Sequence, residues 1–379
     1  MALKVGVVLL VEGTGMSERL GVVLVGCGGI ARSHAFALSK VPNARMVASV
    51  DIDEAAAKRF KDRFGFETCS TDLDAVLARE DVHAVVIATS SKPHGMLIMK
   101  ALHAGKHVLV QKPMTASVVE SRAAVALARE KNLKLMVSFF ELFLPPVERA
   151  KQIIDQGLIG EPFFFKAIMA WYTPDVTAGW RFNPELAGGG VILDGNVHHV
   201  SNALYLLGNP RIDSVYAEYG ALTADVQVED TAVILVRTEK AILEISGSNR
   251  LQEPGGATTA FKDQWQVFGT KGTIAWDAAA RPTFRVFTSD NDALDPLLNN
   301  GWVSPKLPVM PPDHREFSMH INGEESPWVP EHQHFVDACL NDTAVRSDGE
   351  FGLKTQLILE AAYKSGKEGR KLGLDSVGA

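Results

Sequence analysis

A glycine-rich turn between an apolar run and a helical segment constrains this chain more than any other feature. Residues 22–25 read Val-Val-Leu-Val and predict a buried strand, and the next six residues form a G-x-G-x-x-A turn. Gly26 allows the tight turn, Gly28 lets the backbone approach a pyrophosphate, and Ala31 lets helix and strand pack closely, with the helix N-terminus facing the anion. We therefore predict a dinucleotide site. Its predicted pyrophosphate contacts are Gly26, Gly28, Gly29, Ile30 and Ala31.

A carboxylate follows at the position where the ribose of a dinucleotide would need one. Residues 44–50 predict a second strand, which ends at Asp51, about 20 residues beyond the turn. Asp51 would bind the ribose hydroxyls and repel a 2′-phosphate, so NAD is favoured over NADP. NADP stays an alternative, because the basic residues Arg59, Lys61 and Arg63 lie further along the chain and could bind its 2′-phosphate. The alternative is a helix-capping aspartate in an unrelated α/β fold.

Length and composition limit the class of protein. The chain has 379 residues, 46% of them apolar and 22% charged, enough for two domains with their own cores. A net charge of −7 argues against nucleic-acid binding, which needs clustered Lys and Arg. Three cysteines show no metal-binding spacing, so we expect no metal and a reducing, cytoplasmic compartment. The apolar run 5–11 is too short to span a bilayer, and we interpret residues 1–16 as an extra strand or an N-terminal extension.

Strands and helices alternate up to about residue 140. We expect helices at 55–64, 73–79, 95–104 and 118–130, and strands at 83–89, 107–110 and 133–139. This alternation predicts a Rossmann fold, a doubly wound parallel sheet with ligands at the carboxyl ends of its strands. Gly26, Asp51, Ser90 and Lys112 all follow such ends.

Short strands replace the alternation beyond Pro145. After a helix at 147–156, strands are expected at 161–172, 212–219, 230–237, 241–246, 265–268, 273–276 and 283–288. Tight links between them predict a mostly antiparallel open sheet with helices on one face. We expect residues 1–140 to bind NAD(P) and residues 141–379 to bind substrate and form oligomers.

Three features of the second part bear on its surfaces. The run 232–236 is apolar at consecutive positions, so we expect helices to cover one face of that strand and a second subunit, or the chain's own core, to cover the other. Residues 291–330 are rich in Asn, Pro and Asp and predict a surface excursion. Helices at about 331–340 and 352–367 are expected to close the chain.

Two stretches carry residues suited to proton transfer. The glycines at 188–190 predict a loop before a helix on which Asp194 and His198, four residues apart, share one face and could hold a hydroxylated substrate. The alternative is an ordinary hydrogen bond between the two. Lys112 precedes Pro113, which should hold it extended and aimed into the cleft, with the bond between them a candidate for the cis form. The alternative is a solvated lysine at a turn.

Several motifs together resemble one oxidoreductase family. They are the turn at 26–31, the strand 85–89 with His94, the segment 104–113, the stretch 188–198, and the segments 229–231 and 269–273. From about residue 20 onward the chain resembles the Gfo/Idh/MocA family. The resemblance implies a Rossmann domain, an oligomerising sheet domain, and NAD(P)-linked oxidation of a secondary carbinol on a sugar, cyclitol or glycoside. It implies catalytic roles for Lys112, Asp194 and His198. The further cofactor contacts that we predict are Thr89, Ser90, His94, Gln111 and Lys112.

The chain departs from the pattern of this family at four places. Gln111 replaces the usual Glu, which removes a charge beside Lys112. Asn196 replaces a usual Gly, Ser201 stands where Asp is frequent, and residues 140–142 lack the Asn and Arg often found there. These departures predict an altered pocket around an intact catalytic trio.

Charge flow assigns roles to the trio. Oxidation of a carbinol leaves a proton on oxygen, and a histidine with an ordinary pKa of about 6.5 can accept it near neutrality, so we assign His198 as the base. A lysine ordinarily titrates near 10.4 and would need a fall of about three units to be the resting base. Lys112 is therefore assigned to stabilise the alkoxide, and Asp194 to orient a substrate hydroxyl. The reverse assignment stays open, because burial can depress a lysine that far.

Further candidates and alternatives complete the interpretation. Candidates for the wall of the substrate pocket are Tyr172, Trp180, Arg181 and His199. A metal site at Asp194, His198 and His199 is the less favoured interpretation of those residues. Alternative functions are a redox-assisted glycoside-cleaving enzyme with tightly held NAD and a non-catalytic NAD-binding regulator. We expect a small sugar or polyol substrate, no nucleic-acid or membrane partner, and a homo-oligomer.

Overall fold

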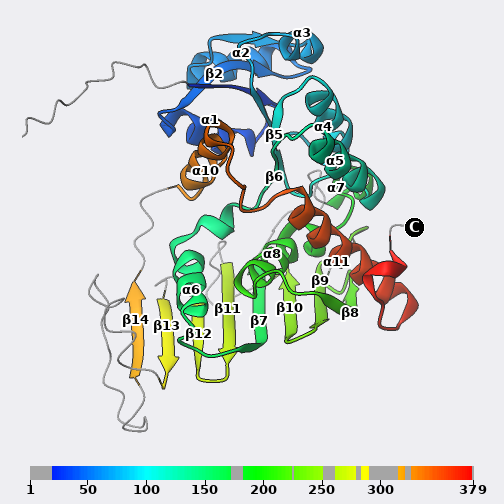
Figure 1. Ribbon diagram of the computed structural model, residues 1–379. Coiled ribbons are helices and arrows are strands. Elements are labelled where there is room, and N and C mark those ends of the chain that lie inside the picture. The colour runs from blue at the N-terminus through cyan, green and yellow to red at the C-terminus, as the bar shows by residue number, and fades with distance from the viewer. Residues whose placement is uncertain are drawn as a thin grey trace, which may run out of the picture.

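The computed structural model arranges the chain as two sheets, one above the other in Figure 1. It describes residues 19–171, 182–223, 226–250, 261–278, 283–289, 315–320 and 326–377. The segment 1–16, interpreted above as a strand or an extension, lies outside these ranges, as does most of 291–330.

The N-terminal sheet is a six-stranded parallel sheet, which confirms the Rossmann prediction. Its strands are β1 (Leu20–Val25), β2 (Ala44–Val50), β3 (Thr68–Ser70), β4 (Ala84–Ile87), β5 (His107–Gln111) and β6 (Leu135–Ser138). Their order is β3-β2-β1-β4-β5-β6, so the order reverses between β1 and β4. Its helices are α1 (Ala31–Lys40), α2 (Glu54–Phe64), α3 (Leu73–Leu77), α4 (His94–His103) and α5 (Val118–Glu130). Every residue of β1 and β4 is buried, as expected for strands covered on both faces.

The C-terminal sheet contains eight described strands and is mostly antiparallel, as predicted. They are β7 (Pro162–Trp171), β8 (Ile212–Gly220), β9 (Thr231–Thr238), β10 (Ile242–Ser248), β11 (Phe261–Gly269), β12 (Gly272–Asp277), β13 (Thr283–Thr288) and β14 (Arg315–His320). Their order is β14-β13-β12-β11-β7-β10-β9-β8, with β7 and β10 parallel. Strand β14 corrects our interpretation of 291–330 as a surface excursion, because residues 315–320 pair along the whole of β13.

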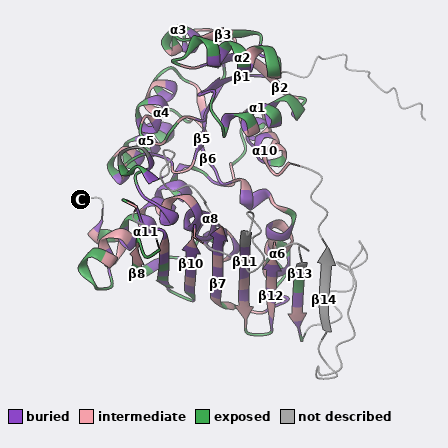
Figure 2. Cartoon of the chain, turned by 180° about the vertical axis from the view of Figure 1, so that it is seen from behind, coloured by how far each residue is buried: buried purple, intermediate pink, exposed green. Residues whose placement is uncertain are grey.

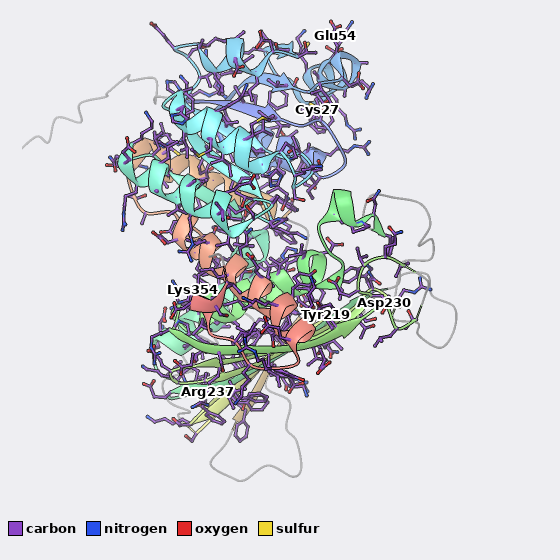
Figure 3. All side chains as sticks on the ribbon, turned by 90° about the vertical axis from the view of Figure 1, so that its right-hand side faces the viewer. Cys27, Glu54, Tyr219, Asp230, Arg237 and Lys354 are labelled. Atoms are coloured by element: carbon purple, nitrogen blue, oxygen red, sulfur yellow. The ribbon has the colours of Figure 1, made fainter. Side chains whose placement is uncertain are left out.

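Helices lie on one face of this sheet, as predicted. The helices beyond residue 139 include η1 (Phe140–Phe143), α6 (Pro145–Asp155), α7 (Pro184–Ala187), the π-helix η3 (Ile192–Asn196), α8 (Val197–Leu206), α10 (Trp328–Asn341), α11 (Gly349–Glu368) and η4 (Leu374–Ser376). Of these, η3, α8, α11 and η4 contact strands of the C-terminal sheet, whereas α10 packs on the N-terminal half. In Figure 3 the helix-side residues Tyr219 and Lys354 lie across the sheet from Arg237. Figure 2 shows buried residues along α8 and the sheet strands, and exposed ones on α2 and α3.

The other face of the C-terminal sheet is open over β9 and β10. Burial alternates along β9, where Val233 and Leu235 are 40% and 41% exposed between buried neighbours. Ile242, paired with Arg237 on the neighbouring strand, is 43% exposed on the same face. The expectation that both faces of 232–236 are covered is therefore wrong within the described part of a single chain, because alternate side chains of the run point away from the helices.

The last two helices return to the N-terminal sheet. Helix α10 packs on α1, and α11 packs on α5 and β6. Ser347, between these helices, pairs with the edge strand β6: its carbonyl accepts from Val137 N at 2.8 Å, and its Oγ donates to Val137 O at 2.6 Å. A division of the chain near residue 140 remains a prediction, and the residues beyond it contribute to both sheets.

Candidate active site

The glycine turn lies where the strand order of the N-terminal sheet reverses. Gly26 has φ +93°, and a Cβ there would lie 2.7 Å from Ala88 O, so the position demands glycine. A Cβ at Gly28 or Gly29 would meet no atom within 4 Å. The turn is thus tight against β4 beneath and open above, which is the shape that a pyrophosphate needs.

Helix α1 starts directly from this turn and offers its N-terminus. Ala31 is fully buried against the strands, while Ile30, at the N-cap, is partly exposed and gives no side-chain cap. The first turn holds no acidic residue. By contrast, Asp53 and Ser117 cap α2 and α5 with their side chains. An uncapped N-terminus beside open glycines suits an anion, so these residues fit the pyrophosphate of NAD.

Asp51 follows β2 and is tied to the turn. Its Oδ2 accepts from Cys27 N at 2.7 Å, and its Oδ1 accepts from Asp53 N at 2.9 Å. A carboxylate has about four acceptor positions, so two stay available for ribose hydroxyls. Arg59, one of the basic residues considered for a 2′-phosphate, lies 3.8 Å from Asp53 and is exposed.

Thr89, Ser90 and His94 follow β4. Thr89 Oγ1 donates to Ser90 O at 3.0 Å; Thr89 is half-buried and Ser90 is exposed. His94 is fully buried, with Nδ1 2.8 Å from Pro113 O and Nε2 3.3 Å from Thr89 O, and burial lowers its pKa. The His94 ring thus joins the loop after β4 to the loop after β5, and its contact with the cofactor stays a prediction.

Lys112 lies at the carboxyl end of β5. The Lys112–Pro113 bond is cis. The lysine Nζ donates to Asp194 O at 2.7 Å and to Asp194 Oδ1 at 3.1 Å. The ammonium and the carboxylate that the sequence separates by 82 residues thus meet as a partly buried ion pair.

Gln111 turns inward and begins a chain of buried hydrogen bonds. Its Oε1 accepts from Lys112 N at 2.7 Å, and its Nε2 lies 3.2 Å from His34 Nε2. His34 Nδ1 lies 3.0 Å from His332 Nε2, and His332 Nδ1 lies 2.7 Å from Trp328 O. We call these five residues the paired chain. Gln111 is 6% exposed, so it reaches a cofactor through the position that it gives to Lys112.

One assignment of protons satisfies every link of the paired chain. If His332 donates from Nδ1 to the Trp328 carbonyl, then His34 donates to His332 and Gln111 donates to His34. Burial lowers the pKa of His34 well below its usual range and that of His332 to about 4, so both rings are neutral. A glutamate at 111 could not donate in its ionised form, which gives the glutamine a physical reason.

The glycine loop and the π-helix position Asp194. Glu229 Oε1 accepts from Gly190 N at 2.9 Å, Ile192 N at 3.1 Å and Tyr363 Oη at 2.6 Å. A Cβ at Gly190 would lie 1.9 Å from Glu229 O, so the close approach requires glycine. The π-helix begins from this anchor, and π turns are frequent at functional sites.

His198 lies in the first turn of α8, which follows η3 without a break. Its pKa is lowered well below the usual range, first by burial, then by the Lys112 ammonium, with Asp194 opposing the shift. Lys112 and Asp194 are therefore in contact, and both lie close enough to His198 for their charges to shift its pKa. Phe140 packs edge-on against the His198 ring with centroids 5.3 Å apart, and it stacks on Trp328.

Two carboxyl groups lie close to two neighbouring imidazoles, one of which is the His198 ring of the trio. His198 Nδ1 is 3.5 Å from Glu141 Oε1, and His199 Nε2 is 3.4 Å from Asp263 Oδ1. We call these four residues the carboxyl–imidazole cluster. Burial raises the pKa of both carboxyls and lowers that of His199.

Four residues were predicted to form the wall of the substrate pocket. His199 is fully buried, and its place in the wall of the substrate pocket stays a prediction. The other predicted pocket residues lie outside the described residues, namely Tyr172, Trp180 and Arg181. Sequence reasoning did not foresee Glu141 or Asp263 beside the histidines. The one hint was that residues 140–142 depart from the family pattern.

Comparison with known proteins identifies the family. Residues 20–139 match the oxidoreductase family with an NAD-binding Rossmann fold (GFO_IDH_MocA), and residues 147–275 match the GFO/IDH/MocA C-terminal domain. The chain belongs to the Gfo/Idh/MocA oxidoreductase family and carries its NAD-binding domain.

Relatives and solved structures agree with this. The chain is 33% identical over 357 residues to scyllo-inositol 2-dehydrogenase (NAD(+)) of Bacillus subtilis, covering 92% of this chain and 99% of that one. It is 32% identical over 308 residues to levoglucosan dehydrogenase of Pseudarthrobacter phenanthrenivorans, covering 72% and 77%. The crystal structure of GenD2 from gentamicin A biosynthesis, in complex with NAD, aligns with a TM-score of 0.77 at 26% identity, covering 97% and 99%. The first two are dehydrogenases by name, and the third was solved with NAD bound.

Two further features of the structure concern membranes and metal ions. Within the ranges that the structure describes, no helix is both long and apolar enough to cross a membrane. Among the same residues, no three His, Cys, Asp or Glu side chains form a group that could hold a metal ion.

Proposed function

We propose that this protein is an NAD-dependent dehydrogenase that oxidises a secondary carbinol of a sugar, cyclitol or glycoside. The observation that carries the proposal is the contact of the Lys112 ammonium, just after β5, with the Asp194 carboxylate in η3. The His198 imidazole in α8 lies close enough for both charges to act on it. Bound NAD, held by the glycine turn and Asp51, supplies the hydride acceptor.

Each member of the trio has a separate role in the proposal. His198 is unprotonated near neutrality because its pKa is lowered, so its ring can take the carbinol proton. Lys112, fixed by two hydrogen bonds to Asp194, stabilises the negative charge that grows on the substrate oxygen. The Asp194 carboxylate, an acceptor of hydrogen bonds, orients a neighbouring hydroxyl of the substrate.

The substrate class is proposed from the relatives. Those compared above are named for scyllo-inositol and levoglucosan, both of which carry several secondary hydroxyls on a six-membered ring. A site with an ammonium, a carboxylate and an imidazole suits such a molecule, because each group can bind one hydroxyl.

The test uses the purified full-length protein with NAD and a panel of inositols, sugars and anhydrosugars. We expect NADH absorbance with at least one compound, and a loss of about 1,000-fold in kcat in Lys112→Ala and in His198→Ala while NAD still binds. Lys100→Ala, at an exposed ion pair with Asp74, is the control and should keep full turnover. Glycoside cleavage without net NADH would instead support the redox-assisted alternative, and full turnover in both site variants would overturn the residue roles.

We also propose that the enzyme forms homo-oligomers through the open face of the C-terminal sheet. Exposed Val233, Leu235 and Ile242 form an apolar patch there, and the Lys166–Glu244 ion pair borders it. Burial of such a patch between copies would supply the missing cover. Light scattering should give a multiple of 41.1 kDa, and a monomer would contradict this. The three free cysteines support a reducing, cytoplasmic location.

A further inference from the structure

A buried carboxyl lies directly behind the proposed base. We propose that Glu141 is the positioning residue of His198: it fixes which ring nitrogen carries the proton and stabilises the imidazolium that forms during turnover. This inference rests on the proposed function, since it concerns how the base of that reaction is prepared.

The backbone and its neighbours hold Glu141 in place. It lies in η1, just after β6, and is 5% exposed. Its Oε2 accepts from Asn202 Nδ2 at 2.9 Å, and Asn202 follows His198 by one turn of α8. Its Oε1 is 3.5 Å from His198 Nδ1, and the Phe140 ring, one residue earlier, contacts the imidazole edge-on. Glu141 therefore cannot turn away without breaking its bond to Asn202.

The chemistry of a histidine base explains why this placement matters. A neutral imidazole carries its proton on one nitrogen and a lone pair on the other. To take a carbinol proton at Nε2, His198 must carry its own proton at Nδ1, which is the nitrogen that faces Glu141. The substrate O–H bond then breaks, an Nε2–H bond forms, and the electron pair stays on the substrate oxygen. The resulting imidazolium presents its Nδ1–H to a carboxylate, an arrangement that stabilises it.

The charged groups that surround Glu141 and His198 shift the pKa values of both residues. Lys112 and Asp194 face His198 from β5 and η3, and His199 and Asp263 lie beneath it on α8 and β11. Burial and the charge of Asp263 raise the pKa of Glu141, while Asn202 and Lys112 lower it. Burial and Lys112 lower the pKa of His198. When the Glu141 carboxyl holds a proton, it can donate that proton to Nδ1 and leave His198 in the inactive tautomer.

The kinetic test compares two buried glutamates. Glu141→Gln keeps size and the bond to Asn202 but removes the carboxylate, so we expect kcat to fall about 10- to 100-fold with KM changed less than about threefold. The acid limb of the kcat profile should move to lower pH, because the proton held by the pair is lost. Glu331→Gln, at a fully buried glutamate on α10 that contacts Ser138, is the matched control and should leave kcat and the limb unchanged. An unchanged limb in Glu141→Gln would overturn the inference.

A second measurement needs no turnover. In protein labelled with 15N-histidine and free of NAD, the His198 signals are found by comparison with His198→Gln. We expect the Nδ1–H tautomer at pH 7 to 8, and the Nε2–H tautomer would overturn the inference even if Glu141→Gln fails to fold. If the wild type oxidises nothing in the panel, the proposed function fails by itself, and the tautomer still decides the role of Glu141.

Discussion

The paired chain and the carboxyl–imidazole cluster are both polar and largely buried. The paired chain contains Lys112 and the cluster contains His198, and the two groups differ in the lengths of their contacts. Links between side chains of the paired chain measure 3.0 and 3.2 Å, and its ends reach backbone groups at 2.7 Å. In the cluster, the two carboxyl–imidazole separations are 3.4 and 3.5 Å. His198 Nδ1 and Asp263 Oδ1 have no hydrogen-bond partner among the described residues.

This difference separates a structural network from a chemical one. A buried network whose donors and acceptors all match contributes to a rigid, specific fold. Buried titratable groups that are only loosely bonded cost stability, and they gather where a site must exchange protons. The paired chain links Lys112 to His34 of α1, whereas the cluster holds titratable groups beside His198, as the proposed role of His198 requires.

The largest effect concerns a buried carboxyl next to the paired chain. Glu331 Oε2 accepts from Ser138 Oγ, its Oε1 has no partner among the described residues, and burial raises its pKa to about 8. Between pH 4.5 and 8 the native state keeps a proton that the unfolded state has released, so stability falls as the pH rises. The advantage of Glu331→Gln over wild type should grow by about 1.4 kcal/mol per pH unit, about 4 kcal/mol from pH 5 to 8.

Urea unfolding at pH 5, 6.5 and 8 measures this dependence. Glu350→Gln, at an exposed position in the first turn of α11, is the control and should show no such trend. If the difference in unfolding free energy between Glu331→Gln and wild type is the same at all three pH values, Glu331 is ionised in the folded protein. The carboxyl oxygen without a partner then costs less stability than the comparison of the two networks implies.

The next effect breaks the paired chain at its centre. His34→Leu removes the ring that joins Gln111 to His332 and leaves two buried nitrogens without partners. We expect a loss of about 3 kcal/mol in unfolding free energy, measured by urea denaturation at pH 7. The same change at exposed His103 should stay within about 0.5 kcal/mol. A loss below about 1 kcal/mol in His34→Leu would show that matched pairing contributes little here.

The smallest effect has the opposite sign. Asp263→Asn replaces a buried carboxyl of the cluster, whose pKa is raised by burial, with a neutral group of equal size. At pH 8 we expect a gain of about 1 kcal/mol in unfolding free energy. Asp74→Asn, at an exposed pair with Lys100, should change stability by less than about 0.5 kcal/mol. A clear loss of unfolding free energy in Asp263→Asn would show that the cluster stabilises the fold, as the paired chain does.

Much of the fold was predictable because its strands carry apolar runs. The glycine turn, the alternation up to residue 140 and seven strands of the second sheet follow from such local patterns. Strand β14 was missed because Arg-Glu-Phe-Ser-Met-His has no apolar run. The parallel pairing of β7 with β10 was not predictable, because strands that lie far apart in the sequence become neighbours.

The candidate site divides in the same way. Lys112, Asp194 and His198 lie in motifs that can be recognised locally. His34 and His332 are 298 residues apart, and neither has a neighbour in sequence that announces the contact. Glu141 stands between phenylalanine and leucine, where a carboxylate would normally be exposed, and only the packing of η1 against α8 puts it behind the base.

The return of α10 and α11 to the N-terminal sheet affects how the protein is made. When the ribosome has delivered residue 140, all six strands of that sheet exist, but α1, α5 and the edge of β6 still lack the helices and the Ser347 contact that cover them. Such a nascent chain presents an unpaired strand edge and uncovered apolar helix faces. The cofactor half is completed by helices that are translated long after its own six strands.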